Sequence, residues 1–257
     1  MVKNKTAIIL GSGLHQIVND MVVEEERSYD EIKDFKPCQV KGHQGKMILG
    51  EIESHPVICC LGRPHWYEGR DSNEFLAFIR ELKNLGATSL IVTNSSGGLN
   101  PSYKAGTMML VNDHINWQFK SPLMGIVEDG RSRFLNMDNA YDLDMRNELL
   151  ASAKSIGIDL KEGVFMGVQG PCFETPAEVK VFQMLGADTV AMSSIPEVIA
   201  ARYYGLSVAM LSVVVNQGAG LSDEVLSHEH TLAMAAKSDV YLAQLLRTYF
   251  GRKSLDS

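Results

Sequence analysis

The sequence predicts a single-domain α/β fold with a mixed central β-sheet flanked by helices. Short runs rich in β-branched residues alternate with segments of helical period, as they do when strands are joined by helices. Hydrophobic residues make up 45% of the 257 residues and charged residues 21%, which is typical of a globular chain with a substantial core. No repeat or Gly/Ser/Pro-rich linker divides the chain, so residues 1–257 are expected to form one domain.

The expected strands are short apolar runs at residues 6–10, 47–52, 57–61, 89–93, 108–111, 163–166, 189–191 and 207–215. Most of them are followed by a helical segment, and that order favours parallel neighbours in the sheet. Runs 47–52 and 57–61 are instead separated by a short turn, which indicates an antiparallel pair. The sheet is therefore expected to be mixed.

The expected helices begin near Ser72, Tyr141, Pro176, Pro196 and His228. The first carries Phe75, Ile79 and Leu82 at spacings of four and three, which places them on one face. Its end is expected at Gly86, because glycine commonly stops a helix. The last helix repeats the pattern with leucines near its end and is expected to be long.

Two helix starts carry capping-box patterns. Thr175 precedes Pro176, and Glu178 stands three residues after the threonine, so both side chains are expected to satisfy backbone amides. Ser194 and Glu197 have the same spacing. That pattern predicts that Glu197 caps its helix and takes no part in catalysis.

Charge and cysteine content exclude several classes of protein. The net charge is −7, from 24 basic and 31 acidic residues, which disfavours nucleic acids and anionic membranes as partners. The four cysteines form no C-x-x-C pair, so a disulfide scaffold and a structural zinc site are not expected. No apolar run approaches the length of a membrane helix. The expected location is the cytoplasm.

Most of the unusual polar clusters follow a predicted strand. They lie at residues 11–13, 62–69, 94–98, 167–174 and 192–194, and at Asn216. Ligands of open α/β sheets bind outside the carboxyl ends of the strands. The clusters are therefore expected to meet in one composite site.

Two of these clusters favour an oxyanion ligand. The GSG motif at 11–13 and the SSGG motif at 95–98 offer backbone amides and hydroxyls at close approach, although GSG also serves ordinary turns. Arg63 and His65 would supply positive charge, unless the arginine lies in a solvated surface loop. The dinucleotide fingerprint fails at Gln16, and Walker A and zincin motifs are absent.

Several other side chains can be interpreted either as parts of a site or as ordinary structural residues. Glu174 directly precedes the capped helix, where it can face the crevice or simply interact with the helix dipole. Ser193 lies beside a helix N-terminus, which favours anions. Met192 and Phe173, each taken alone, are better interpreted as core residues. His228 opens the last helix, either as a neutral hydrogen-bonding group or as a surface residue.

Taken together, the motifs resemble the trimeric purine nucleoside phosphorylase family. The resemblance rests on GRPHWYEG at 62–69, TNSSGGLN at 93–100, GPCFET at 170–175 and MSSIPEVIAAR at 192–202. It runs in family order from about residue 9 to residue 250. It implies phosphorolysis of 6-oxopurine ribonucleosides or deoxyribonucleosides to the free base and the sugar 1-phosphate, in purine salvage.

The resemblance also implies a set of site residues. Phosphate would be held by Ser12, His43, Arg63, His65, Ser95 and Ser193. The nucleoside would contact Tyr67, Ser96, Gly97, Phe134, Phe173, Glu174, Met192, Asn216 and His228. Catalysis would depend on Asn216, Glu174 and His65. Phe134 matches a phenylalanine that reaches a neighbouring subunit's site, which implies a homotrimer.

In this interpretation Glu174 accepts a hydrogen bond from purine N1–H, and Asn216 binds N7 and O6 as negative charge builds on the base. An amide at position 216 favours a 6-oxo over a 6-amino group. Neither a metal nor an organic cofactor is expected, since inorganic phosphate is the co-substrate. Ser95 and Ser96 stand where family members commonly have alanines, and His15 stands where glycine is usual.

The sequence leaves three alternatives open. A methylthioadenosine phosphorylase of the same family would need an acidic residue near position 216 and an apolar 5′ pocket, which Asn216 and His228 oppose. A non-catalytic nucleotide- or phosphate-binding module would need only the glycine loops. A nucleoside hydrolase would carry an aspartate cluster after Leu10, and none is present.

Overall fold

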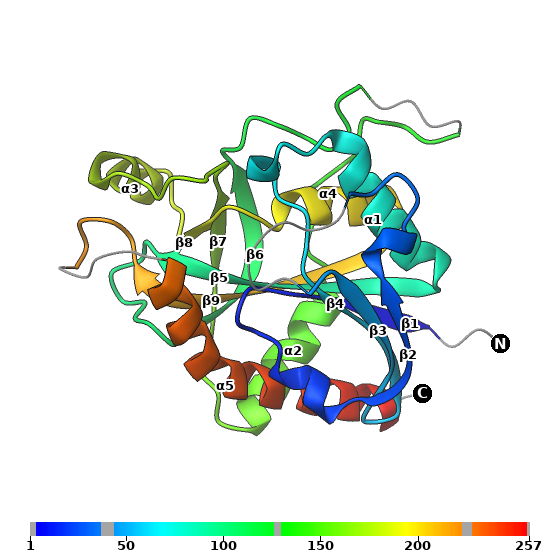
Figure 1. Ribbon diagram of the computed structural model, residues 1–257. Coiled ribbons are helices and arrows are strands. Elements are labelled where there is room, and N and C mark those ends of the chain that lie inside the picture. The colour runs from blue at the N-terminus through cyan, green and yellow to red at the C-terminus, as the bar shows by residue number, and fades with distance from the viewer. Residues whose placement is uncertain (1–3, 37–43, 126–129, 223–227, 256–257) are drawn as a thin grey trace.

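The computed structural model describes residues 4–36, 44–125, 130–222 and 228–255 (Figure 1). Within these residues nine strands form one mixed sheet in the order β2-β3-β4-β1-β5-β8-β7-β6-β9. Strand β9 also pairs with β5, so that β5, β8, β7, β6 and β9 close into a ring. The strands are β1 (Lys5–Leu10), β2 (Val22–Ser28), β3 (Lys46–Ile52), β4 (His55–Leu61), β5 (Ala87–Gly98), β6 (Met108–Asn116), β7 (Leu160–Gly167), β8 (Thr189–Ala191) and β9 (Ser207–Gln217).

The strand pairing confirms a mixed sheet. β1 runs parallel to both β4 and β5, and β5 runs parallel to β9. The expected antiparallel pair is β3 with β4, in which Met47 lies opposite Cys60. β2 pairs with β3 and was not predicted, because its sequence places three glutamates in an exposed edge strand.

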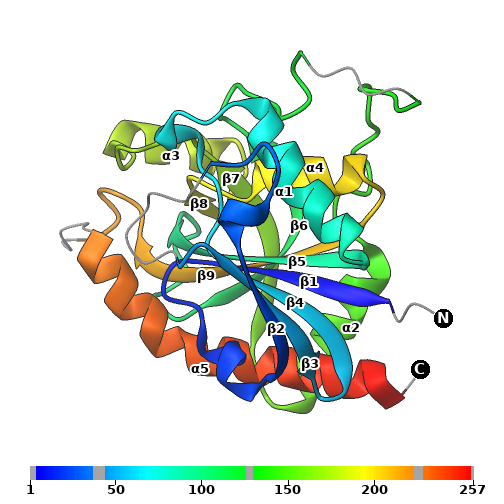
Figure 2. The same cartoon turned by 45° about the vertical axis from the view of Figure 1, so that its right-hand side comes forward.

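Helices cover both faces of the sheet. They are α1 (Ser72–Asn84), α2 (Leu143–Ser155), α3 (Pro176–Met184), α4 (Ile195–Tyr203) and α5 (His228–Leu255). In both views α1 and α4 lie over one face, while α2 and α5 lie over the other (Figures 1 and 2). Alternate residues of β1 serve the two cores: Ile9 packs into the α1/α4 side and Ile8 into the α2/α5 side.

The helix starts follow their caps. α1, α3 and α5 begin at the predicted residues, α4 begins one residue earlier, and α2 begins two residues later than Tyr141. The shift of α2 is explained by Asp142, whose carboxylate accepts the Met145 amide as an N-cap. At α3 the Thr175 hydroxyl accepts from the Glu178 amide, and Glu178 accepts from the Thr175 amide, which confirms this capping box.

The described part of the chain contains no helix that is both long and apolar enough to cross a membrane. Over the same residues, no three His, Cys, Asp or Glu side chains gather in a group that could hold a metal ion.

Candidate active site

A cavity of about 550 Å³ lies at the carboxyl ends of β1, β4, β8 and β9 and beside the last residues of β5. The clusters that follow these strands in the sequence therefore do meet in one place. The predicted residues that line the cavity are Ser12, Arg63, His65, Tyr67, Ser95, Ser96, Gly97, Phe173, Glu174, Met192, Ser193 and Asn216.

Three predicted residues are not part of the described lining. Phe134 lies in the loop before α2 with 88% of its surface exposed, so within this single chain it is away from the cavity. His43 lies outside the described residues. His228 is the first residue of α5, but its side chain is not described.

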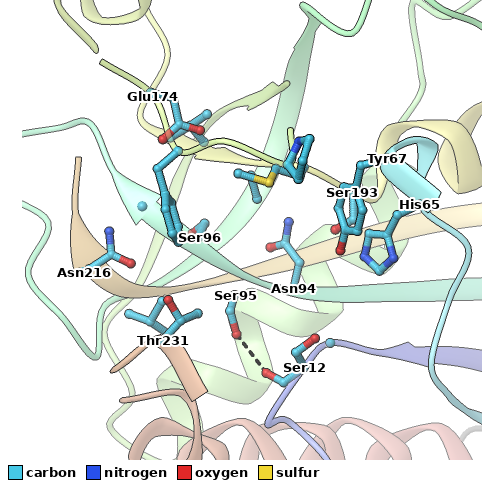
Figure 3. A pocket seen from close by; sticks show the side chains of 18 of the residues that line it. Ser12, His65, Tyr67, Asn94, Ser95, Ser96, Glu174, Ser193, Asn216 and Thr231 are labelled. Carbon is cyan, nitrogen blue, oxygen red and sulfur yellow. Dashed lines mark hydrogen bonds between the residues drawn. The ribbon is translucent and has the colours of Figure 1, made fainter. Parts of the chain in front are cut away.

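The cavity has two chemically different ends (Figure 3). We call the set Arg63, His65, Ser12, Ser95 and Ser193 the cationic end, and the set Phe173, Glu174 and Asn216 the carboxylate end. In Figure 3, His65 and Ser193 lie across the cavity from Glu174 and Asn216, with Asn94 between the two groups. A ligand that spans the cavity would thus meet positive charge and hydroxyls at one end and a carboxylate with an amide at the other.

Arg63 is the fully buried centre of the cationic end, with 1% of its surface exposed. Its Nη1 donates to the Ser194 hydroxyl at 2.8 Å and to the Ser193 hydroxyl at 3.3 Å. Its Nη2 donates to the carbonyl oxygens of Ile9 and Thr93 at 3.1 and 2.5 Å. An oxyanion at this end would share Nη1 with Ser193, so the arginine both supplies charge and orients a hydroxyl.

Glu197 explains how so buried a guanidinium is tolerated. Its carboxylate, also fully buried, lies 3.7 Å from Nε of Arg63 and offsets part of the cost of removing that charge from water. Burial raises the pKa of Glu197, and Arg63 opposes the rise. The expected Ser194–Glu197 capping box is wrong, and within the described residues neither oxygen of the Glu197 carboxylate accepts a hydrogen bond. The Ser194 hydroxyl makes no cap hydrogen bond and serves Arg63 instead.

Ser194 has an unusual backbone for a residue with a side chain, with φ 78° and ψ −46°. A conformation of this kind costs on the order of 1–3 kcal/mol and persists only where surrounding contacts hold it. Here the Arg63 hydrogen bond and full burial hold it. The consequence is local: the neighbouring Ser193 side chain faces the cavity at the entrance to α4.

The loop after β1 is fastened to β5. The amide of Gly11 donates to the Thr93 hydroxyl at 3.0 Å, and that hydroxyl donates to the Ile9 carbonyl at 3.1 Å. The Ser95 hydroxyl donates to the Ser12 carbonyl at 3.1 Å (Figure 3). Gly13 has φ +77°, and a Cβ there would lie 2.9 Å from Ala235 of α5, so only glycine fits this close approach.

The His65 ring is held by a hydrogen-bonding carboxylate and by a stacked aromatic ring. Its Nδ1 lies 3.1 Å from the Glu68 carboxylate, which also accepts the His65 amide at 2.9 Å. Its ring stacks on Tyr67 with centroids 4.6 Å apart. Burial is the main reason that the pKa of His65 is lowered, and burial also raises the pKa of Tyr67 to about 12. Both rings are therefore neutral near pH 7.

The carboxylate end is more open. Phe173 has 41% of its surface exposed and Glu174 is half-buried, whereas Asn216 is buried at the end of β9. Burial raises the pKa of Glu174 above its ordinary value. The Asn216 Nδ2 donates to the Gln217 carbonyl at 2.8 Å, which fixes the plane of the amide.

Sequence reasoning missed Asn94, Glu68 and Thr231, all of which line the cavity. Asn94 is 2% exposed, and neither its amide oxygen nor its amide nitrogen has a hydrogen-bond partner among the residues that the structure describes. The TNSSGG motif that contains it was interpreted only through its serines and glycines. Glu68 stands three residues after His65, a spacing that could have marked it as a partner. Thr231 carries no such signal.

Comparisons with known proteins agree with this geometry. A family model described as the phosphorylase superfamily matches residues 5–251. Purine nucleoside phosphorylase 1 of Bacillus subtilis is 38% identical over 244 residues, which cover 95% of this chain and 90% of the relative. Purine nucleoside phosphorylase of Bos taurus is 39% identical over 219 residues, which cover 83% of this chain and 76% of the relative.

Solved structures give the same picture. The crystal structure of Schistosoma mansoni purine nucleoside phosphorylase in complex with adenosine superposes with a TM-score of 0.89 at 33% identity, covering 97% of this chain and 90% of the other. The structure of isoform 2 from the same organism, in complex with cytosine and ribose-1-phosphate, has a TM-score of 0.90 at 32% identity over the same shares of the two chains.

Proposed function

Because the chain belongs to the purine nucleoside phosphorylase family and catalyses phosphorolysis of purine nucleosides, we propose that its preferred substrates are 6-oxopurine ribonucleosides and deoxyribonucleosides. Inorganic phosphate is the co-substrate, and neither a metal nor an organic cofactor takes part. The products are the free base and ribose 1-phosphate or deoxyribose 1-phosphate. The enzyme would act in purine salvage in the cytoplasm.

One observation carries this proposal: the cationic end and the carboxylate end face each other across a single cavity. The cationic end suits phosphate because Arg63 offers charge and the hydroxyls of Ser12 and Ser193 offer donors, with the neutral His65 ring beside them. Ser95 would add its backbone amide. His43 would complete the phosphate site, as the family resemblance implies.

The reaction needs charge placed in two positions. Phosphate attacks C1′ as the bond from C1′ to purine N9 breaks, so positive charge develops on the ribose and negative charge on the base. Phosphate at the cationic end would lie beneath the ribose and stabilise its charge. Tyr67, Met192 and His228 would contact the sugar, and Phe173, Ser96 and Gly97 would line the base pocket.

At the carboxylate end the two polar side chains divide the work on the base. Glu174, when ionised, accepts from N1–H and orients the purine. Asn216 donates toward N7 and O6, where the negative charge of the leaving base gathers. An amide donor matches a 6-oxo group, whereas a 6-amino group would call for an acceptor.

The assembly we propose is a homotrimer. The Phe134 side chain is 88% exposed in the described chain, and it does not line the cavity of the same subunit. An aromatic ring so exposed is well suited to cover the ribose in a neighbouring subunit's site, as the resemblance implies. Light scattering on the purified chain would measure the mass, and Phe134→Ala would raise the KM for nucleoside if the ring completes a neighbouring site.

The decisive test is a substrate panel with and without phosphate. We expect inosine and guanosine to yield free base only when phosphate is present, and adenosine and methylthioadenosine to react at least tenfold more slowly. A clear preference for either 6-amino substrate would overturn the proposed specificity. Base release without phosphate would instead indicate hydrolysis.

A further inference from the structure

A buried chain of charged side chains runs from His65 to the start of α1. Glu68, in the 3-10 turn Trp66–Glu68, uses one carboxylate oxygen for the backbone amide and Nδ1 of His65. Its second oxygen accepts from Nη2 of Arg70 at 2.9 Å. The His65 ring is thus connected to Arg70 through a single carboxylate.

Arg70 is held on its other side as well. Its Nη1 donates to Glu74 at 2.6 Å and to the Lys36 carbonyl at 2.9 Å. Glu74 in turn accepts the Asp71 amide at 3.3 Å, as the third residue of the α1 capping box. The guanidinium also lies 4.9 Å from the ring centroid of Phe35. Arg70 therefore has one orientation, and it presents one fixed donor to Glu68.

This arrangement is unlike the surface ion pairs of the same region. The side chains of Glu68, Arg70 and Glu74 are 5%, 3% and 3% exposed. By contrast Arg80, also on α1, pairs loosely with Asp34 at 3.7 Å with both side chains well exposed. Buried charges are costly to maintain unless they are paired, and networks of this kind cluster at functional sites. The proposed reaction uses His65 but gives Arg70 and Glu74 no role.

We propose that Arg70 is a positioning residue for phosphate, acting through Glu68 to fix the tautomer and orientation of the His65 ring. Arg70 occupies one oxygen of the Glu68 carboxylate and leaves the other to accept Nδ1–H of His65. The neutral ring then carries its lone pair at Nε2, where it can accept a hydrogen bond from the P–OH group of hydrogenphosphate. The identity of the ligand rests on the proposed function, whereas the tautomer does not.

The charges around His65 agree with a neutral ring. Burial lowers its pKa most, and the positive charges of Arg63 and Arg70 lower it further, while Glu68 raises it. Tyr67 stacks on the ring as a neutral phenol. A neutral imidazole has two tautomers, so something must select one. Glu68 selects the Nδ1–H form only while its carboxylate is held in place.

The first test is nitrogen NMR on the full chain labelled with ¹⁵N-histidine at pH 8. The His65 signals are assigned by their loss in His65→Gln. We expect a single Nδ1–H tautomer in the wild type and a mixture in Arg70→Gln. Arg80→Gln is the matched control and should give the wild-type spectrum. An unchanged His65 tautomer in folded Arg70→Gln would overturn the proposal.

Removal of one buried charge can prevent folding, so a second variant is paired with the first. Arg70→Met combined with Glu74→Gln removes both charges and keeps a residue that can complete the α1 capping box. This variant should show the same mixed tautomer. Far-UV circular dichroism establishes that it is folded.

The second test is a double-mutant cycle in the phosphorolysis assay. Arg70→Gln should raise the KM for phosphate by about tenfold and change the KM for nucleoside by less than twofold. In a Glu68→Ala background the same substitution should have almost no further effect, because Arg70 acts through Glu68. Fully additive losses would overturn this route. A wild type that fails to release base would refute the proposed function, while the NMR experiment would still decide the tautomer.

Discussion

The cationic end of the cavity is tied to the sheet by buried hydrogen bonds, whereas the carboxylate end rests on a loop and on the last residues of β9. Arg63 alone bonds two backbone carbonyls and two hydroxyls. Glu174 is half-buried, and Phe173 beside it is 41% exposed. The difference matches the ligands: one end meets an ion of fixed shape, and the other a base that must enter and leave.

The largest effect is expected at the carboxylate end. Asn216→Ala removes a donor aimed at the charge that develops on the base, so kcat should fall about 10²- to 10³-fold. Phosphate affinity, measured by calorimetry, should remain within about twofold of the wild type, because Asn216 belongs to the other end. If both quantities fell together, the two ends would not be separable.

A substitution between the two ends sharpens the comparison. Asn94→Asp places a negative charge in a buried position that lines the cavity. Like-charge repulsion should raise the KM for phosphate by at least about tenfold at pH 8. Asn94→Ala is the control, which removes the amide but adds no charge, and it should have a clearly smaller effect. Equal effects of the two variants would show that the amide does not lie near the phosphate.

The pH dependence should separate the ends as well. Burial raises the pKa of Glu174 above its ordinary value of 4.5. As the pH falls, the carboxylate is therefore protonated earlier than that of an exposed glutamate. Protonation removes the acceptor for N1–H, and kcat/KM for inosine should then fall about tenfold per pH unit. The profile is measured at saturating phosphate. Glu174→Gln should have a lower plateau without this acid limb; retention of the limb would assign it to another group.

The smallest effect concerns a hydroxyl in the cationic end. Ser95→Ala removes the hydrogen bond to the Ser12 carbonyl, worth about 1 kcal/mol, and should change kcat/KM for phosphate by about fivefold or less. The backbone amide of residue 95 is retained. A loss of a hundredfold or more would mean that the hydroxyl itself contacts phosphate.

Much of the fold could be predicted because its elements carry strong periodicity or clear caps. The helix start at Pro176 follows directly from its cap, whereas the helix that begins at Ser72 was indicated by the spacing of its apolar residues. β2 was not predicted because its side chains are largely exposed and charged, so its sequence shows no alternation of buried and exposed residues. β5 was predicted to end at Thr93 because serines and glycines resemble a loop, yet their backbone stays paired with β9 through Gly98.

The site was predicted less evenly. Arg63 and Asn216 could be placed in one site because each follows a strand, and the carboxyl ends of these strands lie at the same edge of the sheet. Partners that are near in sequence, such as Glu68 for His65, leave a signal in their spacing, but partners that are distant in sequence do not. The spacing of Ser194 to Glu197 fits a capping box, but the buried Arg63 competes for the Ser194 hydroxyl. Pairings of that kind depend on tertiary contact and leave no local pattern.

The long strand β5 has an evolutionary consequence. It carries core residues and cavity residues without a break, from Ala87 to Gly98. A single inserted residue in its first half would move Ser95 out of reach of Ser12 and present a different side chain to the cavity. Substitutions within the TNSSGG stretch, such as an exchange between serine and alanine, are therefore expected to be tolerated during evolution. Insertions or deletions in β5 are not.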